Sequence, residues 1–181
     1  ASAFPDLVKR IEGEGHEAGV HGWDHVRWQD GLPRFDEATI ARELARGFEV
    51  FEEITGHRPR ATAAPGWIAN ARSLAVQDTL ALEYASDARG PFPFLPRAEG
   101  RVFRTPQLPT TLPTLDEMIG GGPESWRSPD GGAGSQRPSG AVPAGEAWIN
   151  DALVEETKRQ TLARHDAPVV HTLHTEVEGL S

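Results

Sequence analysis

The alternation of short apolar segments with longer helical segments constrains the fold of this chain more than any other feature. Residues 36–55, DEATIARELARGFEVFEEIT, carry apolar residues at nearly helical spacing and are followed by Gly56, so they predict a long helix. We expect short strands within residues 16–20, 59–67, 84–87 and 167–174. Strands that alternate with helices are typical of parallel βαβ units, which places the chain in the α/β class.

Three further helices are predicted, one near the start of the chain and two at residues 71–83 and 146–165. Pro5 and Asp6 lie in the first turn of the first helix, where proline and acidic residues suit a helix N-terminus. Because a domain seldom begins so abruptly, we expect the N-terminal part of the natural protein to be missing from this sequence.

The composition limits the possible functions. The formal net charge of −9 disfavours a nucleic-acid partner, because phosphate binding needs a clustered basic surface. There is no cysteine, so a metal site must use histidine and carboxylate, which leaves zinc, cobalt, manganese and nickel open. The sequence has no run of about 18 apolar residues that could span a membrane.

Residues 120–145 interrupt the alternation with a segment rich in glycine, proline and serine. This composition is typical of a flexible insertion. The alternative is a mobile lid that carries Trp126 and Arg127 over a functional site. We treat residues 1–181 as one domain with this insertion.

The candidate functional side chains follow the expected strands. In parallel α/β folds, functional residues gather at the carboxyl ends of the strands. The candidates at such positions are His21, His25, Trp67, Asp87 and His174. This agreement between chemistry and topology favours a functional site at that end of the sheet.

His21 and His25 stand four positions apart in HGWDH. On a helical turn this spacing points both imidazoles the same way, so that they can share one metal ion. The pattern is short, and two surface or capping histidines are the alternative. Asp24 between them is expected to form a local hydrogen bond rather than to bind metal.

The other candidates also have two interpretations each. His174 can act as a general acid near neutral pH, or it can be a hydrogen-bonded histidine among apolar neighbours. Asp87 can hold an imidazole in one tautomer, or it can cap a helix or turn. Trp23 and Trp67 can form the walls of a sugar site by stacking, or they can pack in the core.

Five segments, in this order, resemble the NodB-type polysaccharide deacetylase superfamily: GHEAGVHGWDHVRWQD, ATAAPGW, YASDARGPFPF, QLPTTLPTLDEMIG and HTLHTEVEG. They are most similar to its formyl-sugar branch, whose substrate is a formylated aminoarabinose on undecaprenyl phosphate. The resemblance covers nearly the whole chain except residues 120–145. It implies a partial NodB homology domain, that is, an incomplete (β/α) barrel that lacks its N-terminal strands.

The resemblance also implies the chemistry, a metal-dependent hydrolysis of the formamide that releases formate and the amino sugar. His21 and His25 match the pair that binds a divalent cation (zinc, cobalt or manganese). His174 matches the general acid and Asp87 the residue that orients it, while Trp67 forms a wall of the substrate site. The amino sugar serves lipid A modification, which weakens the binding of cationic antimicrobial peptides.

The implied substrate suggests a peripheral protein on the inner membrane of a Gram-negative cell, on the cytoplasmic face. The family's third metal ligand and base come from an aspartate-rich motif that we expect upstream of residue 1, so this chain alone should be inactive. Ile68 and Asn70 stand where the family is expected to have an arginine and an acid. They favour an alternative, a deacetylase of another N-acylated sugar. A non-catalytic sugar- or lipid-binding protein is the remaining alternative.

Overall fold

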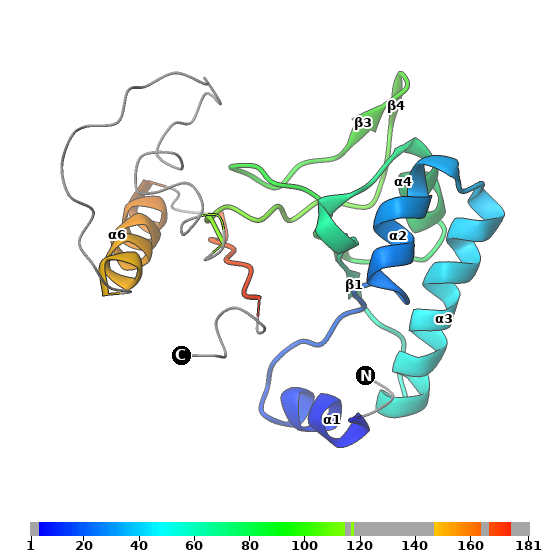
Figure 1. Cartoon of the computed structure of the whole chain (residues 1–181), viewed down its shortest axis with the longest axis horizontal. Coiled ribbons are helices and arrows are strands. Elements are labelled where there is room, and N and C mark those ends of the chain that lie inside the picture. Colours follow the sequence, from blue (N-terminus) through cyan, green and yellow to red (C-terminus); the bar gives the residue numbers. More distant parts are fainter. Residues whose placement is uncertain (1–3, 115–116, 118–146, 164–166, 175–181) are drawn as a thin grey trace. The chain divides into compact units, whose positions relative to one another are not determined.

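The computed structural model describes residues 4–114, 117, 147–163 and 167–174 (Figure 1). The chain divides into two compact units, Ala1–Pro109 and Thr110–Ser181, and each is described by itself. The predicted insertion at residues 120–145 lies outside the described residues.

The first unit contains four parallel segments. Strand β1 (Ala61–Thr62) pairs in parallel with β2 (Tyr84–Ala85), residue for residue. Val20 forms an isolated parallel bridge to the second residue of β1, and Gln107 forms one to the second residue of β2. The order across this strip is therefore Val20, β1, β2 and Gln107. The strands are short, but their parallel pairing agrees with the predicted α/β class.

The remaining elements of the first unit are helical, apart from one hairpin. They are α1 (Pro5–Gly13), α2 (His25–Gly31), η1 (Leu32–Arg34), α3 (Glu37–Thr55), η2 (Pro65–Trp67), α4 (Ala71–Gln77) and the antiparallel pair β3 (Arg97–Ala98) and β4 (Arg101–Val102). No helix in the described part of the chain is long and apolar enough to cross a membrane.

Helix α3 confirms the predicted helix to within one residue. Oδ1 of Asp36 accepts the N–H of Thr39 at 2.8 Å and so caps the N-terminus. Gly56 ends the helix with a left-handed φ of 81°. The apolar face of α3 buries Ile40, Leu44, Phe48 and Phe51.

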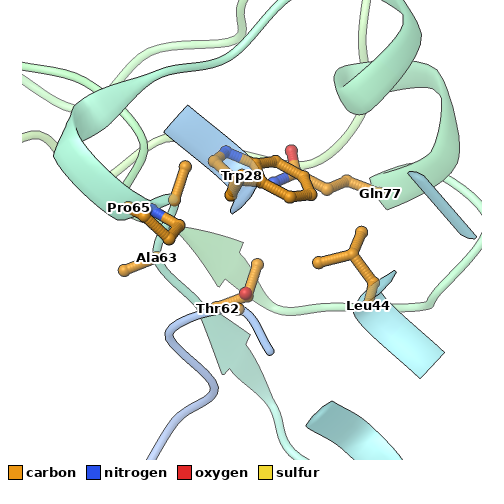
Figure 2. A pocket seen from close by; sticks show the side chains of 8 residues that line it. Trp28, Leu44, Thr62, Ala63, Pro65 and Gln77 are labelled. Atoms are coloured by element: carbon orange, nitrogen blue, oxygen red, sulfur yellow. The ribbon is translucent and has the colours of Figure 1, made fainter. Parts of the chain in front are cut away.

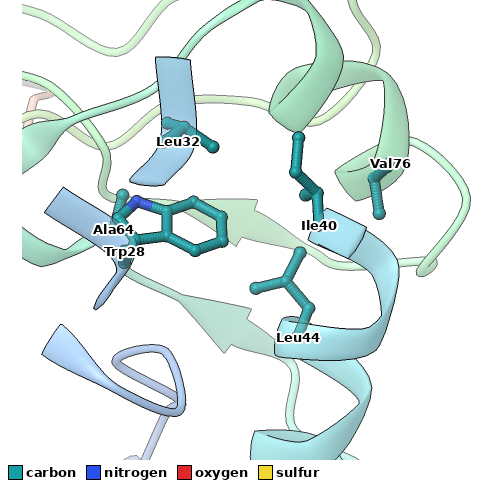
Figure 3. Close-up of a cluster of buried hydrophobic side chains, with 6 residues drawn as sticks. All are labelled: Trp28, Leu32, Ile40, Leu44, Ala64 and Val76. Atoms are coloured by element: carbon teal, nitrogen blue, oxygen red, sulfur yellow. The ribbon is translucent and has the colours of Figure 1, made fainter. Parts of the chain in front are cut away.

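Two apolar clusters hold the helices against the parallel strip. Figure 3 shows the first, formed by Trp28, Leu32, Ile40, Leu44, Ala64 and Val76. The second is formed by Val20, Phe48, Phe51 and Leu82. Burying a large apolar side chain stabilises a fold by about 1.5–3 kcal/mol. Because α3 contributes to both clusters, it is the central element of the core.

Two predicted elements of the first unit are shorter than expected. Helix α4 ends at Gln77 rather than at residue 83. Ala81 has a φ of 55°, in the left-handed region that a right-handed helix cannot contain. The strand expected at residues 16–20 is reduced to the bridge at Val20.

In the second unit, α6 (Ala147–Ala163) confirms the predicted helix at residues 146–165. The strand predicted at residues 167–174 is wrong, because the structure assigns no strand there. Instead, the carbonyl oxygen of Val170 accepts two successive backbone N–H groups, from Thr111 at 2.9 Å and from the next residue at 3.1 Å. That pattern differs from the evenly spaced ladder of a parallel sheet.

Gly47 lies where α3 crosses the segment at Val20, and it provides a test of this packing. A Cβ at position 47 would lie 2.8 Å from Cγ1 of Val20. Gly47→Ala should therefore lower the free energy of unfolding by about 1–3 kcal/mol, despite the better helix propensity of alanine. Thermal unfolding followed by circular dichroism measures the effect. The control is Gly13→Ala, where a Cβ meets nothing within 4 Å; equal losses in both variants would contradict the close approach.

Candidate metal and catalytic site

The two histidines of HGWDH meet across a turn rather than along one helix. Helix α2 begins at His25, with Asp24 as its cap, so His21 precedes the helix and the predicted helical-turn geometry is wrong. Gly22 turns the chain with a φ of 70°, and a Cβ there would lie 3.1 Å from Cγ of Pro65. The two imidazole centroids are 5.3 Å apart, and both side chains are exposed. The turn therefore brings the two rings together at the surface.

Asp24 has the local role that was predicted for it. Its Oδ1 accepts the backbone N–H of Arg27 at 2.9 Å. This cap fixes the residue at which α2 begins, and therefore the position of the backbone that carries His25.

One hydrogen bond fixes the protonation of the His21 ring. Nδ1 of His21 lies 2.9 Å from the backbone oxygen of Ala63. A carbonyl oxygen can only accept, so Nδ1 must carry the proton. In the neutral ring the lone pair then lies on Nε2. Histidines that bind metals commonly donate their other ring N–H to a carbonyl or carboxylate in this way.

The histidine pair fits a metal ion but supplies only part of its ligand set. Imidazole suits the first-row divalent metals, and a catalytic zinc ion typically takes three protein ligands. Among the described residues there is no group of three or more histidine, aspartate or glutamate side chains that could hold a metal ion. His21 and His25 are therefore two candidate ligands of a larger set.

Asp87 is a carboxylate with 3% exposure that is held from several sides. Its Oδ1 accepts the backbone N–H of Ala64 at 2.7 Å. Its Oδ2 accepts Nε2 of Gln77 at 2.6 Å and Nε2 of Gln107 at 3.2 Å. The side-chain oxygen of Gln107 in turn accepts the backbone N–H of Asp87 at 2.9 Å. Asp87 therefore joins β2 to α4, to the loop after β1 and to the segment at Gln107, and it is not an exposed turn cap.

Burial raises the pKa of Asp87 above its ordinary value, because a poorly solvated site disfavours the charged form. The hydrogen bonds from Gln77, Gln107 and Ala64 oppose this effect by stabilising the carboxylate. An electrostatic interaction with His21 also lowers the pKa. Burial is the largest of these influences.

A single peptide group links Asp87 to His21. The carbonyl of Ala63 accepts the proton of His21, and the N–H of Ala64, at the other end of the same peptide bond, donates to Asp87. Hydrogen bonds in such a chain polarise one another. A charged Asp87 therefore makes the oxygen of Ala63 a better acceptor and holds His21 in the tautomer whose Nε2 carries no proton.

Both candidate tryptophans have an arginine over the ring, which sequence reasoning missed. The guanidinium of Arg46 lies 4.4 Å from the ring centroid of Trp23, and that of Arg89 lies 5.0 Å from the ring of Trp67. Trp23 is 41% exposed, so core packing is wrong for this residue. An aromatic ring can stack on a sugar, and the guanidinium beside it can pair with a phosphate.

Two hollows adjoin the histidine turn. Figure 2 shows one beneath the loop after β1, where Trp28 and Pro65 lie close together; its volume of about 0 Å³ leaves no room for water. The other has a volume of about 550 Å³ and lies between α1, α3 and the segment at residues 17–23. His21 and Trp23 contribute to its lining, which is otherwise mostly apolar. Of these two hollows, the larger has room for part of a ligand.

His174 belongs to the second unit, where it is half-buried. The structure brings His21, His25 and Asp87 together within the first unit. The role of His174 as general acid and that of Asp87 in orienting it stay predictions.

Residues 1–85 match the model of the polysaccharide deacetylase family. This segment contains both histidines, β1, β2 and α3. Over this segment the chain is similar to the polysaccharide deacetylase family, whose members are hydrolases that act on carbon–nitrogen amide bonds.

Two curated relatives carry a more specific name, "Probable 4-deoxy-4-formamido-L-arabinose-phosphoundecaprenol deformylase ArnD". The protein from Shewanella sediminis is 32% identical over 114 residues, which is 63% of this chain and 36% of the relative. The protein from Wigglesworthia glossinidia brevipalpis is 33% identical over 105 residues, which is 58% of this chain and 37% of the relative. The matches thus span little more than a third of the length of these relatives.

Solved structures resemble this fold at low sequence identity. A protein from Mycobacterium smegmatis that is named as a polysaccharide deacetylase has a TM-score of 0.66 and 20% identity, covering 96% of this chain and 55% of the other. Puue allantoinase has a TM-score of 0.60 and 16% identity, covering 96% and 51%. These likenesses support an α/β fold of the polysaccharide deacetylase type.

Asp87, which is buried, and Asp36, which caps α3, should contribute to the free energy of unfolding with opposite dependence on pH. The pKa of Asp87 is raised on folding, so its contribution to stability is full below the unfolded pKa, near 3.8, and is lost as pH rises through the folded pKa. The pKa of Asp36 is lowered by hydrogen bonds from Thr39, so its contribution is full above the unfolded pKa and is lost as pH falls through the folded pKa.

Urea unfolding of the wild type, Asp87→Asn and Asp36→Asn between about pH 3.5 and pH 7, with a metal chelator present, tests this difference. The stability of the wild type relative to Asp87→Asn should fall as pH rises. Its stability relative to Asp36→Asn should rise over the same range. A difference for Asp87→Asn that grows with pH would contradict the burial of this carboxylate.

Proposed function

We propose that this chain carries part of the active site of a metal-dependent hydrolase that removes the formyl group from undecaprenyl-phosphate-linked 4-deoxy-4-formamido-L-arabinose. The observation that carries the proposal is the pairing of His21 with His25, with Nδ1 of His21 committed to the carbonyl of Ala63. The family supports an amide as the bond hydrolysed, and the names of the two curated relatives support the sugar and its lipid carrier.

His21 and His25 would hold a divalent cation, with zinc, cobalt and manganese as the candidates. Such an ion would lower the pKa of a bound water and polarise the formyl oxygen. A carboxylate outside the described residues would supply the third ligand and the general base. We place the site in an incomplete NodB-type barrel over residues 1–181, with an insertion at residues 120–145.

His174 would protonate the departing sugar amine, because an amide anion is too poor a leaving group. Asp87 would hold His21 through the Ala63–Ala64 peptide and orient His174. Trp67 and Trp23 would flank the sugar, and the arginine over each ring would pair with the phosphate. The lipid carrier would keep the protein at the cytoplasmic face of the inner membrane, and the amino sugar would serve lipid A modification.

A deacetylase of another N-acylated sugar is the second candidate. It is favoured by Ile68 and Asn70, which stand where the formyl-sugar branch is expected to have two charged residues. Asn70 caps α4 by accepting the N–H of Ser73 at 3.0 Å, and the carbonyl of Ile68 accepts the indole N–H of Trp28 at 2.9 Å. Ile68 and Asn70 thus both stabilise the fold next to Trp67, and neither carries a charge that could form an ion pair there.

Replacement of the paired histidines should weaken metal binding by the chain itself. His21→Ala and His25→Ala should each lower the affinity for Co²⁺ or Zn²⁺ by at least about tenfold, because each removes a ligand. Isothermal titration calorimetry measures this affinity. The control is His16→Ala, an exposed histidine in the segment before Val20. Equal affinity in all four proteins would contradict the site.

Formate release decides between the two candidate functions. The full-length natural protein, loaded with metal, should release formate from the lipid-linked formamido sugar faster than it releases acetate from the N-acetyl counterpart. Faster release of acetate would favour the deacetylase. A metal-loaded protein that releases neither would refute both.

A further inference from the structure

In the sequence of the first unit, an exposed apolar loop follows Asp87 of the candidate site. Residues 91–95, PFPFL, are all exposed, with Phe92 at 56%, Phe94 at 41% and Leu95 at 52%. Val102 of β4 adds a further apolar side chain at 43% exposure. Contiguous exposed apolar side chains of this kind usually mark a surface that binds a protein or a membrane. We refer to residues 91–102 as the docking loop.

The docking loop lies in a basic stretch of an acidic chain. Residues 88–104 contain four arginines and one glutamate, although the whole chain has a formal net charge of −9. Arg97, Arg101 and Arg104 are exposed. Arg101 and Arg104 lie 3.4 Å and 4.0 Å from the buried carboxylate of Asp78, which holds them on this side of the unit.

The backbone of the docking loop is well supported. Phe94 exchanges two backbone hydrogen bonds with Gln107, at 3.1 Å and 2.8 Å. The β3–β4 hairpin closes through Glu99 and Gly100, whose φ values of 50° and 74° are typical of a tight two-residue turn. In Figure 1 this hairpin projects from the first unit. The apolar side chains are thus presented by an ordered scaffold.

The same scaffold connects the docking loop to the candidate site. Gln107, which pairs with Phe94, also donates to the carboxylate of Asp87. Arg89, just before the loop, lies over the ring of Trp67. The loop is therefore anchored to Asp87 and Trp67, two residues of the candidate site.

We propose that the docking loop binds the surface of an anionic lipid bilayer, with Phe92, Phe94 and Leu95 in the headgroup region and the arginines on lipid phosphates. Apolar insertion combined with basic residues is the usual basis of peripheral binding to anionic membranes. This inference rests on the proposed function, whose substrate is held in a membrane by its lipid carrier.

Charge distinguishes the docking loop from the exposed apolar side chains of helix α1. Helix α1 exposes Leu7 and Ile11, at 51% and 44%. That helix and the residue after it carry three acids, Asp6, Glu12 and Glu14, against two basic residues. An anionic bilayer therefore favours the docking loop over α1.

Vesicle flotation of the chain tests the proposal. Binding to phosphatidylcholine vesicles that contain about one third phosphatidylglycerol should exceed binding to phosphatidylcholine alone. The double variant Phe92→Ser/Leu95→Ser and the variant Arg97→Glu should each reduce binding by at least about tenfold. The matched controls, Leu7→Ser/Ile11→Ser in α1 and Arg34→Glu in η1, should bind like the wild type.

Loss of binding in the α1 control instead, or equal binding to both kinds of vesicle, would overturn the proposal. If the docking loop bound a second copy of the chain instead of a bilayer, sedimentation would show a dimer that the loop variants abolish, and this result would also overturn the proposal.

The vesicle flotation assay needs no catalysis, so its outcome is independent of the formate assay. In the full-length enzyme, the loop variants should lose activity on vesicle-held substrate and keep activity on a water-soluble formamido sugar. A wild-type enzyme that is inactive on both substrates would refute the proposed function, but it would not refute the proposal that the docking loop binds membranes.

Discussion

The hydrogen-bonded peptide between Ala63 and Ala64 is the interaction on which the candidate site depends. Its carbonyl holds His21 and its N–H is held by Asp87, so one rigid group sets the relation between an exposed imidazole and a buried carboxylate. The peptide directly follows β1, and the core cluster under α2 and α3 buries Ala64. The geometry of the histidine turn is therefore tied to the core rather than to a surface loop alone.

This arrangement explains why a carboxylate that is costly to bury is useful in this position. Burial disfavours the charge of Asp87, and two glutamines and a backbone N–H offset part of that cost. In this position the carboxylate polarises the Ala63–Ala64 peptide, and the polarised carbonyl stabilises the tautomer of His21 with the proton on Nδ1. An arrangement that destabilises a protein slightly while fixing a reactive group is common at functional sites.

The sequence predicted the long helices well, because their signals are local. Asp36, the apolar spacing and Gly56 define α3 without reference to the rest of the chain. The strand lengths and the end of α4 depended on distant partners and on the left-handed Ala81, which periodicity does not reveal. The histidine pair was predicted from its spacing, but the turn at Gly22, not a helix, produces it.

The partners of Asp87 were beyond sequence reasoning for the same physical reason. Gln77 and Gln107 lie 10 and 20 residues away along the chain and meet the carboxylate only once β2 is packed. Both are almost fully buried, at 2% and 1% exposure. The available signal was Gln77, a polar side chain three positions after Leu74 on the buried side of α4.

The most direct test of the account is the tautomer of His21, read from the ¹⁵N chemical shifts of the imidazole in the metal-free chain above the pH at which the ring is protonated. The account predicts a proton on Nδ1 in the wild type, and a smaller population of that tautomer in Asp87→Asn. A proton on Nε2 in the wild type would contradict it, because that nitrogen would then be unable to bind a metal ion.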